Sequence, residues 1–168
     1  KTDAVYDELL VMMAQTGDQR AFERLHARWS KRLARAALRY TGSAETARDL
    51  SQECWMAIWK GIARLRDPKR FRSYAFGVLH RRGADHVRAS IQARARKGSH
   101  EEADRLSEPA RQSESSALNQ AFAALPAEQR LAAHLHFVEG LTLNEIAEAQ
   151  NIPAGTAKSR LFHARRKL

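Results

Sequence analysis

The sequence predicts an all-α protein made of two small helical domains joined by a flexible linker. Glycine and proline are scarce, at 8 and 4 of 168 residues, whereas the helix-favouring residues alanine, leucine, arginine and glutamate are abundant. Apolar side chains recur at three- and four-residue spacing along most of the chain, as they do on one face of a helix. This spacing stops only between residues 97 and 116. We therefore expect a first domain over 3–96, a linker over 97–116, and a second domain over 117–168.

The first domain begins with two predicted helices, one over residues 3–15 and one that ends at Thr41-Gly42. Asp18 follows a Thr-Gly pair and is a plausible N-cap for the second helix. The apolar face of the first helix is expected to consist of Val5, Leu9, Met12 and Met13. The apolar side chains of the second helix are those of Phe22, Leu25, Trp29, Leu33, Ala36, Leu38 and Tyr40.

Two further helices complete the predicted first domain, one from the cap Ser43 to about Leu65 and one from about Phe71 into residues 94–96. Arg66-Asp67-Pro68 separates them, since proline cannot continue a helix. The helix after Ser43 has one apolar stripe of Leu50, Cys54, Ile58 and Ile62, with Trp55 and Trp59 beside it. Four helices with short connections should share one core.

Residues 97–116 differ in composition from both flanking regions. Leu106 is their only large apolar residue, and five carboxylates outnumber three basic side chains. Such a segment cannot bury enough apolar surface to order itself, so we expect a flexible linker.

The second domain is predicted to begin with two apolar-rich helices, the latter starting at Pro126 and ending at Gly140. Proline suits a first helical turn and glycine suits the position after a last one. The apolar side chains of these helices are those of Leu118, Phe122, Leu125, Leu131, Leu135, Phe137 and Val138.

The last 28 residues, 141–168, have the pattern of a helix-turn-helix. Thr142 and Glu145 form a capping box at the start of its first helix, and Asn151 tolerates the left-handed conformation at its end. Pro153 precedes the second helix, whose apolar stripe consists of Ala157, Leu161, Ala164 and Leu168. The other side of that helix is basic. The alternative is a helical hairpin whose basic side is simply solvated.

The net charge of +10 and a pI near 10.5 suit a polyanionic partner, and an anionic membrane surface would satisfy the same charge. No apolar run approaches the roughly 18 residues of a spanning helix, and no signal-peptide core appears at the start, so direct membrane insertion is not expected. Cys54 is the single cysteine, which excludes an internal disulfide and fits a reducing cytoplasm.

Two constellations of side chains are candidates for binding. Asp49, Gln52, Glu53 and Met56 fall on one side of the third predicted helix, opposite its apolar stripe. A solvated helix face is the alternative interpretation of this stripe.

Around the start of the fourth helix, aromatic side chains alternate with basic ones, a combination that suits single-stranded nucleic acid. The residues concerned are Lys69, Arg70, Phe71, Arg72, Tyr74, Arg81, Arg82 and Arg88. The alternative is that the aromatic rings belong to the core and the arginines are solvated.

The sequence offers little for catalysis or metal binding. The seven histidines include no HExxH motif and no paired Cys/His spacing, and His134 and His136 point to different sides of a helix. No phosphate-binding glycine loop and no nucleophile with an adjacent base are apparent. We therefore expect no metal, no cofactor and no enzymatic activity.

Three motifs, in this order, resemble those of the extracytoplasmic-function sigma factors of bacterial RNA polymerase, and the likeness runs from near Val5 to Leu168. The first motif is Ala47-Arg-Asp49-Leu-Ser-Gln52-Glu53. The second is Phe71-Arg-Ser-Tyr74 with Ala84-Asp85-His-Val-Arg88. The third comprises Leu125-Pro126, Gln129-Arg130, Glu139-Gly140-Leu141, Glu145-Ile-Ala147 and Gly155-Thr156-Ala-Lys158-Ser159-Arg160.

The resemblance implies a transcription initiation factor that brings core RNA polymerase to promoters. It implies polymerase binding by Asp49, Gln52, Glu53 and Met56. It implies binding of the melted minus-10 element by Lys69, Arg70, Phe71, Arg72, Tyr74, Arg81 and Arg88. For the minus-35 element it implies base contacts from Lys158, Ser159, Phe162 and His163 and phosphate contacts from Thr156, Arg160 and Arg165.

Three residues depart from the family's usual pattern and bear on which promoter is read. Tyr74 stands where tryptophan is usual, Arg81 where asparagine is common, and His163 where arginine is frequent. Tyrosine still allows a base to stack.

The resemblance also implies partners and a location. Members of this family are commonly held by an anti-sigma factor, and they work in the cytoplasm with core polymerase and promoter DNA. Two rival classes are a two-domain helix-turn-helix repressor acting without polymerase and an enzyme of nucleic-acid metabolism. A repressor would bind duplex DNA specifically by itself, and an enzyme would need catalytic groups.

Overall fold

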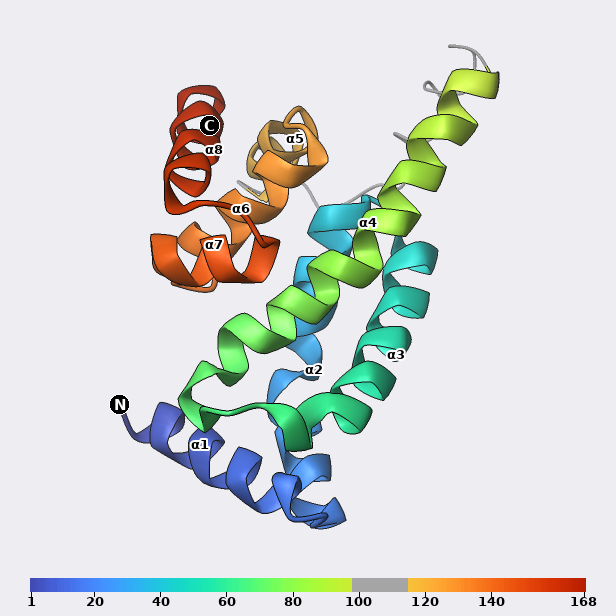
Figure 1. Cartoon of the computed structure of the whole chain (residues 1–168). Coiled ribbons are helices and arrows are strands. Elements are labelled where there is room, and N and C mark those ends of the chain that lie inside the picture. Colours follow the sequence, from blue (N-terminus) through green and yellow to red (C-terminus); the bar gives the residue numbers. More distant parts are fainter. Residues whose placement is uncertain (98–114) are drawn as a thin grey trace.

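The computed structural model describes residues 1–97 and 115–168, and those two ranges contain helices and no strand (Figure 1). The predicted all-α fold is confirmed. The helices of the first range are α1 (Thr2–Gln15), α2 (Gln19–Thr41), α3 (Ala44–Gly61), the 3-10 turns η1 (Ile62–Arg64) and η2 (Pro68–Arg70), and α4 (Phe71–Lys97). Those of the second are α5 (Ser115–Ala123), α6 (Ala127–Phe137), α7 (Leu143–Gln150) and α8 (Ala154–Lys167). Of the linker predicted over 97–116, residues 98–114 lie outside the described residues, and the residues at its two ends belong to α4 and α5.

The helix boundaries follow local capping signals in the sequence. The side chain of Asp18 accepts a hydrogen bond from the Ala21 amide, at 3.1 Å, and Ser43 caps α3 in the same way. Both hydrogen bonds of the Thr142–Glu145 capping box are present. Asn151 has a φ of 52°, the left-handed conformation expected after α7.

In the first domain, α2, α3 and α4 share the predicted apolar core. Trp29 lies at its centre, 3% exposed, with its ring edge-on to Phe71 at a centroid distance of 5.3 Å. The stripe of Leu50, Cys54, Ile58 and Ile62 is buried as predicted. Burial raises the pKa of the Cys54 thiol to about 12.

The prediction for α1 was wrong, because the helix buries its opposite side. Val5, Leu9 and Met12 are 65%, 50% and 49% exposed, whereas Leu10, Val11 and Ala14 are buried. Apolar residues occur on both sides of α1, so polar contacts fix its rotation. Asp7 accepts from Arg28 Nε at 2.6 Å, and Gln15 Nε2 donates to the carbonyls of Ile62 and Leu65.

Several side chains predicted for the core are also half-exposed. They are Leu38, Trp59, Leu118, Phe137, Val138 and Leu168. Leu38 and Val138 both line a groove described below, and Leu168 is the C-cap residue of α8. Periodicity identifies a helix more reliably than it identifies which of its apolar residues meet a neighbour.

The two domains are packed against each other in the structure, with α6 and α7 resting on α2 and α4 (Figure 1). One apolar cluster continues from Leu33 and Phe76 of the first domain to Leu131, Ile146 and Leu161 of the second. At Gly77 of α4, a Cβ would lie 3.5 Å from the Ala149 carbonyl oxygen of α7, so the two helix backbones approach closely. Two domains joined by a tether were predicted from the sequence, but this contact between them was not.

Candidate nucleic-acid interface

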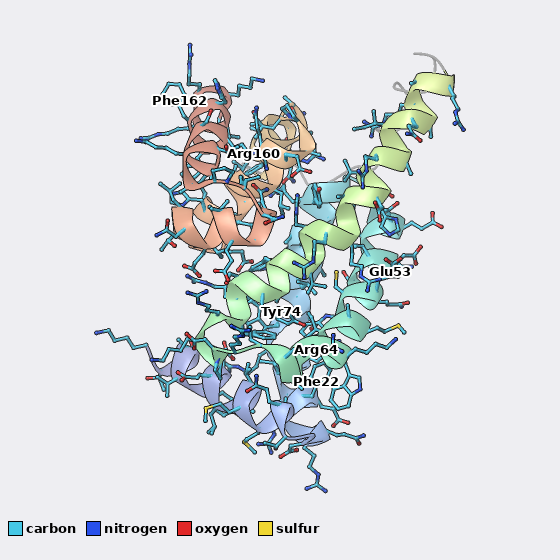
Figure 2. The ribbon with its side chains drawn as sticks, in the orientation of Figure 1. Phe22, Glu53, Arg64, Tyr74, Arg160 and Phe162 are labelled. Carbon is cyan, nitrogen blue, oxygen red and sulfur yellow. The ribbon has the colours of Figure 1, made fainter. Side chains whose placement is uncertain are left out.

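The side of α3 opposite the core presents the predicted stripe of Asp49, Gln52, Glu53 and Met56. Asp49 and Gln52 are exposed, and Met56 is 61% exposed. Glu53 is half-buried beside α4, where His86 Nε2 lies 3.2 Å from its carboxylate (Figure 2). This side of α3 therefore offers carboxylates, an amide and an uncovered apolar side chain together.

At the start of α4, the structure separates the aromatic residues from the cations. Phe71 is 2% exposed and packs on Trp29, so the prediction that its ring holds a DNA base was wrong. Phe71 and Tyr74 are three residues apart, and both rings lean toward the core, with Tyr74 half-buried. Burial raises the pKa of the Tyr74 hydroxyl.

The cations near Phe71 point outward, and two of them meet carboxylates of α7. Arg72 forms a bidentate pair with Glu145, with Nε–Oε2 at 2.9 Å and Nη2–Oε1 at 2.6 Å. Arg70 Nη1 lies 3.5 Å from Glu148 Oε1, and Lys69 is exposed. Burial alone would raise the pKa of Glu145, but hydrogen bonds from Arg72 and Thr142 hold it below its ordinary value.

Farther along α4, Arg81 and Arg88 are exposed. Arg88 Nη2 lies 2.6 Å from Asp85 one turn earlier. Because both side chains are more than two-thirds exposed, this pair leaves the guanidinium available to a stronger anion.

The outer side of α8 carries the predicted recognition residues. Lys158, Ser159, Phe162 and His163 are exposed, opposite the buried Ala157, Leu161 and Ala164. Phe162 is 59% exposed and points away from the rest of the domain (Figure 2). The predicted phosphate-contact residues Thr156 and Arg165 are exposed as well. An apolar ring set among basic and polar groups on one helix side suits a DNA groove.

Arg160 differs from the other residues predicted on α8. It is half-buried, and its Nη1 donates to Gln150 Oε1 at 3.0 Å and lies 3.5 Å from Glu128 Oε2. Arg160 thus holds α8 against α6 and α7, and the predicted phosphate contact is unsupported by its position.

Glu128, which sequence analysis missed, is the meeting point of both domains. Its carboxylate accepts from the Tyr40 hydroxyl at 2.6 Å and lies 2.8 Å from His80 Nε2. Burial alone would raise the pKa of Glu128, but the hydrogen bonds from His80 and Tyr40 hold it below its ordinary value. In the sequence, a glutamate in the first turn of a helix indicates only a favourable interaction with the helix dipole.

Two further contacts between the domains were also missed. Arg32 Nε donates to Glu139 Oε2 at 2.8 Å, and the Glu139 side chain is only 5% exposed. Arg130 donates to the main-chain carbonyls of Arg39 and Tyr40 at the end of α2. Partners 90 to 107 residues apart in the chain leave no local pattern to detect.

Beside these contacts, a groove of about 660 Å³ opens between α2, α4, α5 and α6. Its lining combines apolar side chains with four arginines and contains no carboxylate among the described residues. The arginines are Arg35, Arg39, Arg94 and Arg130. His134 also faces the groove, and burial together with Arg39 and Arg35 lowers its pKa to about 4.

Within residues 1–97 and 115–168, no group of three or more His, Cys, Asp or Glu side chains could hold a metal ion. None of the described helices is long and apolar enough to cross a membrane.

Comparison with known proteins decides between the classes considered from sequence. Residues 25–92 match the family model of sigma-70 region 2, and residues 115–168 match that of sigma-70 region 4. The chain is also 26% identical over 182 residues to the ECF RNA polymerase sigma-E factor of Escherichia coli, covering 98% of this chain and 93% of the relative. The chain belongs to the extracytoplasmic-function family of sigma factors.

Other similarities extend over nearly the whole sigma factor. It is 26% identical to the RNA polymerase sigma-H factor of Pseudomonas aeruginosa, over 95% of this chain and 90% of that one. It superposes with a TM-score of 0.70 on CnrH, solved in complex with the cytosolic domain of CnrY, at 26% identity and over 96% and 94% of the two chains. The sigma factor RpoE of Bartonella quintana, solved with the anti-sigma factor NepR, shares the fold with a TM-score of 0.66 at 20% identity, over 87% and 92% of the chains. A sigma factor directs RNA polymerase to promoters, and this outcome favours the predicted initiation factor over the two-domain repressor.

Proposed function

We propose that this sigma factor docks on core RNA polymerase through α3, holds the melted minus-10 strand at the start of α4, and reads the minus-35 element with α8. The observation that carries the proposal is the outer side of α8, where four potential base-reading side chains are exposed directly opposite the buried stripe. The division into domains over 3–96 and 117–168 with a linker over 97–116 is part of the proposal. Each role requires binding alone, so the chain acts without catalysis and works in the cytoplasm with polymerase.

Polymerase binding is assigned to Asp49, Gln52, Glu53 and Met56. Carboxylates around one exposed apolar side chain provide charge complementarity at the rim of an interface and apolar burial within it. The partner surface on polymerase should therefore be basic with an apolar pocket.

Minus-10 binding is assigned to Lys69, Arg70, Arg72, Tyr74, Arg81 and Arg88. The cations would neutralise phosphates, and the half-buried Tyr74 would offer one face of its ring to an unstacked base. Phe71 supports this surface from within the core.

Minus-35 binding is assigned to Lys158, Ser159, Phe162 and His163 at base edges and to Thr156 and Arg165 at phosphates. Phe162 suits a thymine methyl group, and Lys158 suits the acceptors of guanine. Arg160 contributes by positioning α8 through Gln150.

Run-off transcription from a promoter library, with and without core polymerase, tests the function. We expect transcripts from a narrow set of promoters that depend on both core polymerase and this chain. Sequence-specific duplex binding by the chain alone at nanomolar concentration, with no stimulation of polymerase, would instead support the repressor.

The same assay separates base contacts from phosphate contacts on α8. Lys158→Ala is expected to change which minus-35 sequences are preferred, because a base contact contributes about 1–3 kcal/mol of discrimination. Arg165→Ala should lower output from all promoters alike, because phosphates carry no sequence information. An unchanged preference profile for Lys158→Ala would remove this residue from the reading surface.

We also propose an anti-sigma factor as a partner. The structurally similar RpoE was solved with the anti-sigma factor NepR, and CnrH was solved with the cytosolic domain of CnrY. The groove between α2, α4, α5 and α6 suits an acidic, partly apolar segment, because four arginines line it without a compensating carboxylate. Arg35→Glu/Arg94→Glu should weaken the inhibitor at least about tenfold in calorimetric titration. The exposed pair Arg20→Glu/Arg24→Glu is the matched control. Equal affinity of all three proteins would place the inhibitor elsewhere.

A further inference from the structure

The contact between the two domains falls on the surface assigned above to the minus-10 strand. Helix α7 packs against α4 (Figure 1). Its two carboxylates, Glu145 and Glu148, meet cations at the start of α4. Glu145 engages the guanidinium of Arg72 at two points, and Glu148 lies near Arg70 and accepts from the Ser73 hydroxyl at 3.3 Å. Arginine forms the same bidentate geometry with a carboxylate as with a phosphate. The carboxylates of α7 therefore occupy positions where phosphates of a bound strand would otherwise be held.

The other two proposed surfaces remain uncovered in the same conformation. Asp49 and Met56 on α3 are exposed, as are Lys158 and Phe162 on α8. The packing of the domains thus covers one binding surface selectively and leaves those for polymerase and for the minus-35 element accessible.

Contacts away from the DNA surface hold the domains in this arrangement. Glu139 is buried and paired with Arg32, Glu128 joins Tyr40 and His80 to the second domain, and an apolar core runs through the junction. At the junction Gly77 brings α4 within van der Waals distance of α7. These contacts therefore hold Glu145 and Glu148 of α7 in place beside the start of α4.

We propose that the second domain is a built-in competitor for the minus-10 strand, in which Glu145 and Glu148 of α7 replace DNA phosphates on Arg72 and Arg70 until the domains part. This inference rests on the proposed role of those arginines in strand binding. The closed chain can meet polymerase through α3, but it binds the melted strand only after α7 leaves α4. A closed fraction lowers the apparent affinity for the strand in proportion to the fraction that remains open.

Two kinds of variant of the full chain open the interface by different means. Glu145→Gln/Glu148→Gln removes the charges facing the arginines, and glutamine at position 145 preserves the capping box of α7. Gly77→Leu adds bulk against the α7 backbone without changing any charge. The matched controls are Glu8→Gln/Glu23→Gln on α1 and α2, and Gly77→Ala, whose Cβ fits at ordinary contact distance.

Two measurements are made on each protein: small-angle scattering for domain separation, and fluorescence anisotropy with a labelled single-stranded oligonucleotide carrying a minus-10 element selected by run-off transcription. For both opening variants we expect a larger radius of gyration and at least about tenfold tighter strand binding, while both controls match the parent protein. Circular dichroism should show unchanged helix content. Domains that separate without a gain in strand binding would overturn the masking, and domains that stay closed in both opening variants would overturn the role of these contacts.

One further variant separates this inference from the proposed function. Arg70→Ala/Arg72→Ala is introduced into the opened protein. Loss of the gained strand affinity supports both ideas. Full retention of that affinity, with the domains still apart, would show that the strand binds elsewhere, and the carboxylates would then mask nothing.

Discussion

Replacing Asp49 and Glu53 together by lysine is expected to lower the affinity of the sigma factor for core RNA polymerase at least about thirtyfold. Reversing both charges in an interface removes favourable pairs and places like charges together, and such a juxtaposition of like charges costs several kcal/mol. Thirtyfold corresponds to roughly 2 kcal/mol. The variant should fold normally, because Asp49 is exposed and the half-buried Glu53 has a single side-chain hydrogen-bond partner, His86, among the described residues.

The measurement is a binding titration of labelled sigma factor with core polymerase, accompanied by circular dichroism. Glu8→Lys/Glu23→Lys changes the net charge equally on α1 and α2 and is the matched control. If both double variants bind core polymerase as tightly as the parent protein, the stripe on α3 is only a solvated helix face.

A second large effect is expected at Gly83, in the middle of α4. A Cβ there would lie 2.8 Å from two ring carbons of Tyr40 and 3.1 Å from Leu50 Cδ2. Tyr40 is fully buried and its hydroxyl is held by Glu128, so the ring has little freedom to move. Gly83→Ala should therefore lower the free energy of unfolding by about 1–3 kcal/mol, as overpacked cores do. Helix propensity alone would predict a gain of roughly 0.5–1 kcal/mol.

Gly77→Ala provides the comparison within the same helix. Its Cβ would stand 3.5 Å from the nearest α7 atom, so this variant should be neutral or slightly stabilised. Urea unfolding followed by circular dichroism measures both variants. A Gly83→Ala protein at least as stable as Gly77→Ala would mean that Tyr40 and Leu50 can shift after all.

Helix boundaries and exposed helix faces could be predicted from the sequence, because they depend on residues close together in the chain. Asp18, Ser43 and Thr142 cap helices through hydrogen bonds to residues three positions away, so each boundary could be recognised from a few neighbours. The exposed side of α8 was likewise predictable, because one buried stripe at helical spacing fixes which residues face outward.

Features that depend on distant partners were not predictable. Phe71 is an aromatic residue among basic ones, as a base-stacking residue would be, but its ring belongs to the core because it packs against Trp29. Arg160 belongs to a DNA-contacting motif but is drawn inward by Gln150 and Glu128. The rotation of α1 was decided by Arg28 on α2. In each case a contacting residue on another helix determined which of two chemically reasonable positions was adopted.

The pair of Arg32 and the buried Glu139 has a consequence during protein synthesis. The two residues are 107 positions apart, and Tyr40 precedes its partner Glu128 by 88. At about 5–20 residues per second, the ribosome adds the later residue on the order of 5–20 s after the earlier one. Through that interval Arg32 of α2 and Arg70 and Arg72 at the start of α4 are present without the carboxylates that they meet in the folded chain. Glu139, Glu145 and Glu148, which pair with these three arginines, all belong to the second domain, so this part of the basic surface stays available to other anions until the second domain has been synthesised.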